Sequence, residues 1–320
     1  MSKQSQTAVP APAGDRGKKR KKKKLGTSYN WQFWAIIALP MIYAFIFAYV
    51  PMGGIIMAFE NYSPRKGIFH SQWVGLRYFR QFFTTPSSSR IIINTLRLGI
   101  YSLLVNFPLP IILAICLNEM RSQKYKKFIQ MVTYAPYFIS TVVLVGMMMK
   151  SMDLRTGIFN TVLKALGFQP VNFFGDASLF PSLYVWSTLW QTAGYSSIIY
   201  IAALAGVNPE LQEAAIVDGA SRIQRILHVD LPSIAPTIIT MLIFNSASVI
   251  NIGFDKVYLM QNDINRSTSE VISTFVYKVG LTQGDFGFST AAGLFQSAIS
   301  FGLLVLVNFI CKRLTDTSLW

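Results

Sequence analysis

The side chains that could carry out chemistry are few and far apart in this sequence. Its two histidines, His70 and His228, and its two cysteines, Cys116 and Cys311, form no C-x-x-C pair and no cluster with the spacing of metal ligands. The phosphate-binding pattern G-x-x-x-x-G-K-[ST] is absent, because segment 14–19 has the wrong spacing and no strand before it. No nucleophile–base pair or carboxylate dyad stands out either. The sequence therefore predicts a chain with no catalytic residue, metal site or cofactor of its own.

A second group of polar side chains lies inside otherwise apolar sequence. Asn245, Ser248, Asn251 and Asp255 fall within about 120° of one another on a helix that turns by 100° per residue. Such a stripe either lines a pathway for a polar solute or forms hydrogen bonds between helices. Aromatic and polar residues of other apolar segments are candidates for the same pathway. The predicted pathway residues are Asn245, Ser248 and Asn251 of the stripe, together with Tyr137, Trp190, Gln296 and Ser300.

Long runs without charge indicate which elements must position these residues. The chain has 320 residues, of which 52% are hydrophobic, and six of its stretches contain no Asp, Glu, Lys, Arg or His. A hydrocarbon layer roughly 30 Å thick requires about 20 mainly apolar residues per helix, and each stretch is long enough. We therefore predict an all-α membrane protein, a six-helix bundle, rather than a soluble domain or an outer-membrane barrel. The predicted spans are 31–58, 94–118, 128–149, 181–206, 234–254 and 286–311.

Basic residues predict the orientation of these spans. Cytoplasmic segments carry an excess of Lys and Arg, and the basic run 18–24 and the basic loop 119–127 fit the cytoplasmic side. Both termini are then cytoplasmic. Residues 1–29 are predicted to be a disordered basic tail on a membrane domain of residues 30–320. Such a tail can bind nucleic acid, but attraction to anionic lipid explains a basic segment beside a span more simply.

The segments predicted to face outward also carry a net positive charge, against the usual bias. Either they attract an anionic solute over a long range, or their charges pair locally or with an acidic partner.

The loop before the fifth span has a local design of its own. Asn208-Pro209 has the residue types of an N-cap and a first helical position, and Gly219 permits a chain reversal. Ser221 and Gln224 have the spacing of a capping box, and Leu231-Pro232 is expected to end the second helix. The loop is therefore predicted to be a helix–turn–helix. It is either a tight turn between spans or a docking surface for a cytoplasmic partner.

Three motifs in this loop resemble the EAA loop of permease subunits of bacterial ATP-binding-cassette importers. They are Glu213-Ala214-Ala215, Asp218-Gly219-Ala220 and Leu231-Pro232, and their spacing and their place before the penultimate span also fit. Similarity to the carbohydrate-uptake branch extends over about residues 31–315 and leaves out the basic tail. It is carried by Trp73-Val74-Gly75-Leu76-Arg77-Tyr78-Phe79, Asn94-Thr95, Gly157-Ile158-Phe159-Asn160 and Gly284-Asp285-Phe286-Gly287.

This resemblance implies a type I importer permease fold, with loop 208–232 as a coupling helix seated in an ATPase subunit that binds ATP and Mg²⁺. The implied partners are a second homologous permease, two ATPase subunits, an extracytoplasmic solute-binding protein and membrane lipids, but no nucleic acid. The implied function is passage of a sugar or oligosaccharide, uronate-containing ones included, across the bacterial inner membrane. The residues assigned to ATPase coupling are Glu213, Ala214, Ala215, Asp218 and Gly219, with Arg222 and Arg225 as additional charge contacts.

Two other function classes remain open from the residues alone. An ion-coupled secondary transporter of small polar solutes would normally place ionisable groups inside the membrane, and the predicted spans have none apart from Arg97. A membrane scaffold or sensor would dock partners through the 208–232 loop without transport.

Overall fold

The computed structural model describes residues 30–315 and 318, whose regular structure is almost entirely helical. The chain divides into two compact units, residues 1–53 and 54–320. In the first unit, α1 (Asn30–Ala44), a π-helical turn η1 (Phe45–Tyr49) and α2 (Val50–Met52) follow one another, with mainly exposed apolar side chains. Exposed apolar side chains are expected on a helix that faces lipid. The predicted tail 1–29 lies outside the described residues.

The second unit contains a long series of helices, the first of which begins at Gly53 on the boundary, and one two-stranded sheet. In the sheet, Glu60 lies opposite Trp73 in an antiparallel pair. The elements are η2 (Gly53–Phe59), β1 (Glu60–Asn61), η3 (Ile68–His70), β2 (Gln72–Trp73), α3 (Arg77–Thr84), α4 (Pro86–Asn106), α5 (Pro108–Asn118), α6 (Gln123–Tyr134), η4 (Ala135–Phe138), α7 (Thr141–Ser151), α8 (Ile158–Ala165), α9 (Phe180–Ala205), α10 (Pro209–Val217), α11 (Arg222–Arg225), η5 (Ile226–Asp230), α12 (Leu231–Ala247), α13 (Phe254–Met260), α14 (Arg266–Ser269), α15 (Ile272–Tyr277), η6 (Lys278–Thr282) and α16 (Phe286–Thr315).

Most of the predicted spans correspond to long apolar helices. Among the described residues, four helical stretches, 31–59, 86–118, 222–247 and 286–313, are long and apolar enough to cross a membrane. The predicted span 181–206 coincides with α9, which has 26 residues but many hydroxyl and aromatic side chains. The count of six spans stays a prediction.

The predicted span 128–149 contains a sharp bend, of 98° between 123–138 and 141–151. Pro136 lies in the 3₁₀ turn η4 between α6 and α7, and it cannot donate a backbone hydrogen bond. Ser140 then caps the new helix, since its hydroxyl accepts a hydrogen bond from the Val143 amide. If the two helices form one broken span, the described residues contain five candidates for crossing the membrane.

The fifth predicted span, 234–254, also ends earlier than expected. Helix α12 stops at Ala247, and α13 starts only at Phe254. Non-helical backbone inside a membrane protein is tolerated where protein or a cavity surrounds it. Here the Gln296 side-chain amide donates to the Ile250 carbonyl at 3.0 Å, which satisfies one of the freed backbone groups.

The sequence predicted that Leu231-Pro232 ends the second helix of the loop, and this prediction is wrong. Helix α11 continues through the π-helical turn η5 directly into α12, so 222–247 is one helical stretch. A proline removes one backbone donor from a helix, and the wider π turn immediately before it accommodates that loss.

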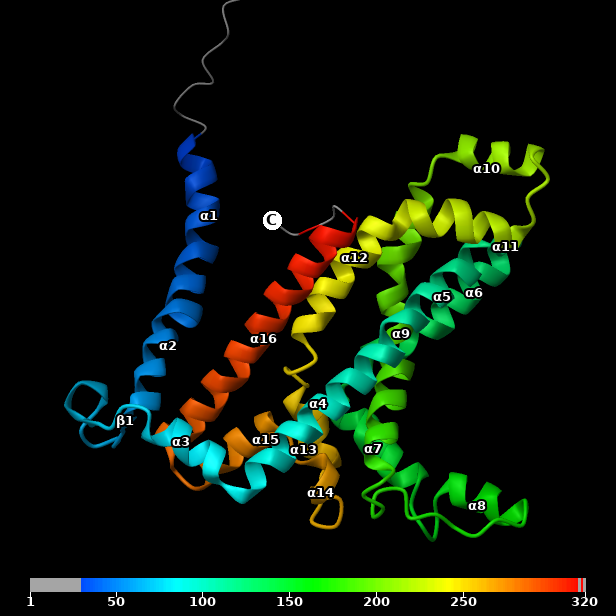
Figure 1. Ribbon diagram of the computed structural model, residues 1–320. Helices are drawn as coiled ribbons and strands as arrows, with labels where there is room; N and C mark the ends of the chain where they lie inside the picture. The colour runs from blue at the N-terminus through cyan, green and yellow to red at the C-terminus, as the bar shows by residue number, and fades with distance from the viewer. Residues whose placement is uncertain (1–29, 316–317, 319–320) are drawn as a thin grey trace, which may run out of the picture. The chain divides into compact units, whose positions relative to one another are not determined.

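Three apolar clusters hold the second unit together. One joins α4, α7, α9 and α13, the second joins α3, η6 and α16, and the third joins α5, α9 and the start of α12. Within this unit, α10 and α11 lie at one end of the long helices, whereas α8, α13 and α14 lie at the other (Figure 1). Helix α9 runs between the two ends and contacts α4, α5 and α12.

Candidate functional site

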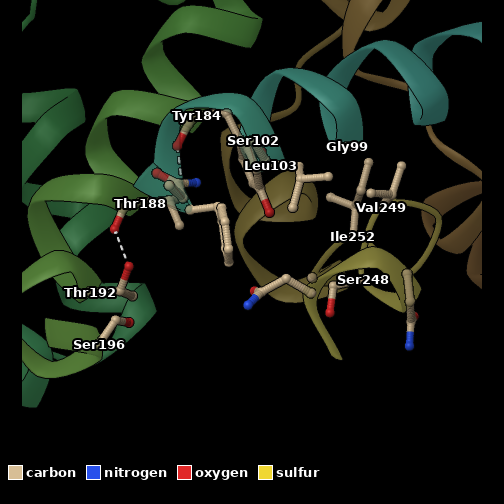
Figure 2. A pocket seen from close by; sticks show the side chains of 15 residues that line it. Gly99, Ser102, Leu103, Tyr184, Thr188, Thr192, Ser196, Ser248, Val249 and Ile252 are labelled. Atoms are coloured by element: carbon tan, nitrogen blue, oxygen red, sulfur yellow. Dashed lines mark hydrogen bonds between the residues drawn. The ribbon is translucent and has the colours of Figure 1, made fainter. Parts of the chain in front are cut away.

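A cavity of about 300 Å³ lies between α4, α9 and the turn that follows α12 (Figure 2). Its lining is rich in hydroxyl and amide groups and contains no charged side chain. The lining residues are Gly99, Ser102, Leu103, Asn106 and Phe107 from α4 and its end, Tyr184, Thr188, Thr192 and Ser196 from α9, and Asn245, Ser248, Val249, Asn251, Ile252 and Gly253 from α12 and the turn.

Helix α9 presents one polar face to this cavity. Tyr184, Thr188, Thr192 and Ser196 are spaced by four residues, so they lie above one another on one side of the helix. The Thr188 hydroxyl donates to the Tyr184 carbonyl at 2.7 Å, and the Thr192 hydroxyl donates to the Thr188 carbonyl at 2.8 Å (Figure 2). Because both protons are used within the helix, these hydroxyl oxygens remain available as acceptors.

Two polar atoms on the α4 wall have no partner among the described residues. Ser102 Oγ and Asn106 Oδ1 are both buried and form no hydrogen bond there. An unsatisfied buried polar group costs about 1–3 kcal/mol. A solute with hydroxyl groups in the cavity would satisfy both atoms.

The α4 wall can approach the turn closely because residue 99 is glycine. A Cβ atom at Gly99 would lie 1.7 Å from the Val249 carbonyl oxygen, far inside van der Waals contact. Gly99 therefore fixes the distance between α4 and the turn that carries Ser248 and Asn251.

A second cavity, of about 440 Å³, adjoins the first and extends it along α9. The two share four lining residues, Asn106, Phe107, Ser196 and Asn245. Residues that line the second cavity but not the first include Pro110 from α5 and Met241 from α12. The two cavities therefore adjoin each other between α4–α5, α9 and α12, and the second has the more apolar lining.

The structure brings together three of the predicted pathway residues. Asn245, Ser248 and Asn251 all line the first cavity. They do so from the end of α12 and the turn after it, so the helical stripe from which they were inferred does not exist as such. Asp255, the fourth member of that stripe, is not among the lining residues.

The other four predicted pathway residues lie outside the lining of the first cavity. Trp190 lines a separate, mainly apolar cavity of about 520 Å³ between α7 and α9. Tyr137 stacks on Tyr195, which lines the second cavity, with ring centroids 3.8 Å apart. Gln296 supports the turn, as described above, and Ser300 Oγ is buried without a partner among the described residues.

Sequence reasoning missed the α9 face and Lys256. The spacing of Thr188, Thr192 and Ser196 was a signal for the α9 face. Lys256, on α13 after the last residue of the fifth predicted span, is only 7% exposed. Its ammonium donates to Thr188 Oγ1 at 3.0 Å and lies 5.6 Å from the centroid of the Tyr184 ring. Burial lowers the pKa of Lys256 to about 7.

The loop 208–232 has the predicted helix–turn–helix geometry. Asn208 caps α10, since its side-chain oxygen accepts a hydrogen bond from the Glu210 amide at 3.0 Å. Gly219 has a positive φ of 77°, and Ser221 and Gln224 form both bonds of a capping box at the start of α11. The cap at Asn208, the turn at Gly219 and the capping box form as predicted, whereas the predicted helix end at Leu231-Pro232 does not.

A partly buried hydrogen-bonded bridge joins α10 to the helix that follows it. The Gln212 amide donates to Asp230 Oδ1 at 2.6 Å, and Arg225 donates to Gln212 Oε1 at 3.0 Å. Asp230 is 3% exposed. The predicted coupling residue Arg225 is therefore engaged inside the loop, and α10 is tied to the stretch that continues into α12.

The outer surface of the loop is open to a partner. Glu213, Ala214, Asp218, Gly219 and Arg222 are exposed, and Ala215 is half-buried beside a cleft of about 330 Å³ between α10 and α11. Glu213 forms no hydrogen bond or ion pair with the described part of the chain. Large apolar side chains are also exposed here, namely Leu211, Ile216, Val217, Ile223 and Leu227.

Comparison with known proteins gives consistent matches over most of the chain. Residues 106–316 match the family model described as binding-protein-dependent transport system inner membrane component. In Bacillus subtilis (strain 168), Protein LplB is 41% identical over 91% of both chains. The polygalacturonan/rhamnogalacturonan transport system permease protein YteP of the same organism is 39% identical over 95% of both.

Two solved structures share the fold. A chain of a bacterial ABC transporter involved in the import of the acidic polysaccharide alginate is 35% identical, with a TM-score of 0.84 over 90% of this chain and 97% of that one. A chain of the bacterial alginate ABC transporter, in complex with alginate pentasaccharide-bound periplasmic protein, is 34% identical and also has a TM-score of 0.84. It is matched over 91% of this chain and 98% of its own.

Proposed function

Because this chain belongs to the family of binding-protein-dependent transport system inner membrane components, we propose that it is the permease subunit of an ATP-driven importer of acidic oligosaccharides. The observation that carries the proposal is the pair of adjoining cavities between α4–α5, α9 and α12. Their volumes are within the usual range of small-molecule sites, roughly 300–1,000 Å³. This chain would form one side of the translocation pathway.

The lining of the first cavity suits a sugar. A saccharide offers many hydroxyl groups that both donate and accept, and the wall supplies hydroxyl and amide groups without a fixed charge. Asn106 Oδ1 and Ser102 Oγ in particular are buried and unpaired among the described residues, so a sugar hydroxyl would gain their full bond. An apolar solute would leave both atoms unsatisfied.

The acidic character of the cargo is inferred from relatives and from charge. One relative is named for polygalacturonan and rhamnogalacturonan transport, and one structural neighbour imports alginate, an acidic polysaccharide. The net positive charge of the segments predicted to face outward would attract such a cargo.

Loop 208–232 is the proposed contact with an ATPase subunit that binds ATP and Mg²⁺. Its exposed carboxylate Glu213 lacks a partner in the described part of the chain, and its exposed apolar side chains would be covered by a groove. The bridge through Gln212 and Asp230 would pass a movement of α10 to α12, which helps to line both cavities. Two ATPase subunits, a second homologous permease and an extracytoplasmic solute-binding protein complete the proposed assembly, with both termini of this chain in the cytoplasm.

A charge reversal in the loop tests this proposal. In a complex of both permeases and the ATPase subunits reconstituted in proteoliposomes, Glu213→Lys should lower ATP-driven oligosaccharide uptake by about tenfold or more, since losing a buried interface charge pair costs 2–5 kcal/mol. Glu210→Lys is the matched control on the same helix. Its carboxylate accepts a hydrogen bond from Asn208 within the same loop, so uptake should fall by less than about threefold. Full coupled uptake with Glu213→Lys would overturn the proposed docking.

A further inference from the structure

Lys256 is a buried cation that forms no ion pair with any described residue. Its ammonium has one hydrogen-bond acceptor in that part of the chain, Thr188 Oγ1. The ion pairs found there join Arg266 to Asp263 and Lys278 to Glu270 instead. A buried charge without a partner is expensive, and in a membrane protein such a residue commonly has a functional role.

The surroundings of the ammonium connect it to the first cavity. Thr188 and Tyr184, its two neighbours, both line that cavity (Figure 2). The Thr188 hydroxyl already donates its proton to the Tyr184 carbonyl, so it offers the ammonium only a lone pair. A lysine ammonium has three N–H donors. Lys256 is not itself a lining residue, so it lies behind the side chains of Thr188 and Tyr184. A negative group that enters between these two side chains could use donors that the described part of the chain leaves unused.

Resting on the proposed function, we propose that Lys256 determines specificity by binding a carboxylate of the cargo in the first cavity. The same sugar unit would place its hydroxyl groups against Ser102 Oγ and Asn106 Oδ1 on the opposite wall. The cavity would thus select a uronate unit over a neutral sugar of the same size. Burial lowers the pKa of Lys256, and an anion beside it would favour the protonated form again.

The structure favours a local role for Lys256 over general attraction by outer charges. Neither Lys164 nor Lys256 is itself a lining residue of the first cavity. Lys164, on α8 at the same end of the unit, is exposed, whereas Lys256 contacts Thr188 and Tyr184, which line the cavity. Removing either lysine changes the net charge of the outer segments equally. Only the substitution of Lys256 removes a hydrogen-bond donor beside the cavity. Comparing it with the substitution of Lys164 therefore separates local binding from long-range attraction.

The test is uptake of two matched trisaccharides by the complete reconstituted importer with its solute-binding protein. One is trigalacturonate, and the other is the same trisaccharide with its carboxyl groups reduced to alcohols. We expect Lys256→Gln, which can keep a bond to Thr188, to lower subsaturating uptake of trigalacturonate by about tenfold or more, as expected for loss of a charge-assisted bond. Uptake of the reduced trisaccharide should stay within about twofold of the wild type.

Two controls keep the result decisive. Lys164→Met should leave both uptakes unchanged, and Lys256→Arg, which keeps the charge, should retain the preference for the acidic sugar. Co-purification with the second permease and the ATPases checks assembly of each variant, and Lys256→Met replaces the Gln variant if that variant does not assemble.

The outcomes separate this inference from the proposed function. Equal losses for both sugars, or no loss for either, would overturn the role of Lys256 while ATP-driven uptake by the wild type stands. If Lys256→Arg lost the preference along with Lys256→Gln, a charge-based role would be wrong. If the wild type imported neither sugar with ATP, the proposed function would fail, and the inference would fail with it.

Discussion

At the scale of single residues, the absence of a side chain at Gly99 is as important as any functional group. Helix α4 touches the Val249 backbone there, and a Cβ atom has no room. We expect Gly99→Ala to lower the free energy of unfolding by about 1–3 kcal/mol, because overpacking forces backbone shifts. The thermal midpoint of the detergent-solubilised complex measures the effect.

Gly146 in α7 provides the matched control. A Cβ atom at that position meets nothing within 4 Å, and alanine is favoured over glycine in a helix by about 1 kcal/mol. Gly146→Ala should therefore leave the thermal midpoint unchanged or raise it. Equal effects of the two substitutions would contradict the close approach of α4 to the turn.

Removing each of two hydroxyl groups on α4 should affect oligosaccharide uptake and protein stability differently. Ser102 Oγ is buried and unpaired in the described part of the chain, so Ser102→Ala should keep or slightly raise stability while lowering oligosaccharide uptake severalfold. The Thr95 hydroxyl donates to the Ile91 carbonyl and accepts from the Ile272 amide at 3.1 Å. Thr95→Ala should therefore destabilise the protein, by about 1–3 kcal/mol. The reverse ranking in thermal unfolding would argue against a cargo role for Ser102.

At the scale of elements, the turn between α10 and α11 depends on the left-handed conformation of Gly219. A β-branched residue in that conformation is strained, by at least 1–2 kcal/mol, whereas asparagine tolerates it well. Since the turn is exposed, Gly219→Val should reduce ATP-driven uptake severalfold with little change in the melting of the rest of the protein. Gly219→Asn should behave like the wild type. Equal uptake by both variants would show that the turn geometry is not needed for coupling.

The elements also show how far local sequence signals reach. The loop was predictable because its signals, the cap at Asn208, the turn at Gly219 and the capping box, act within a few residues. The break after α12 was not predicted, and the side chain that satisfies its Ile250 carbonyl, Gln296, is distant in sequence. The bend at η4 had a signal in Pro136, but prolines in membrane helices do not always bend them.

Only part of the candidate site could be predicted, because local sequence signals do not show which distant residues meet in the fold. Asn245, Ser248 and Asn251 were found because polar groups are unusual in apolar sequence, although the helix assumed for them is broken. Trp190 was predicted to line the pathway but lines the separate apolar cavity. A tryptophan ring can stack on a sugar or pack in an apolar cavity, so its residue type does not distinguish the two. The role of Lys256 depends on contact with Thr188, which is 68 positions away and invisible from local sequence.

At the scale of the whole molecule, the charges divide into groups with different proposed roles. The basic tail is proposed to contact lipid and fix orientation, the outer segments to attract the cargo, and Glu213 to engage the ATPase. The polar lining of the cavities carries no charge of its own, and Lys256 lies immediately behind it. This separation suits a pathway that takes its energy from another polypeptide.

The source of that energy is the central claim, and one measurement tests it directly. The importer is reconstituted in proteoliposomes with the loaded solute-binding protein, and trigalacturonate uptake is compared with internal ATP and no ion gradient, and with a proton or sodium gradient and no ATP. We predict uptake with ATP alone and none with either gradient alone. Uptake driven by a gradient without ATP, or no uptake with ATP, would contradict the account.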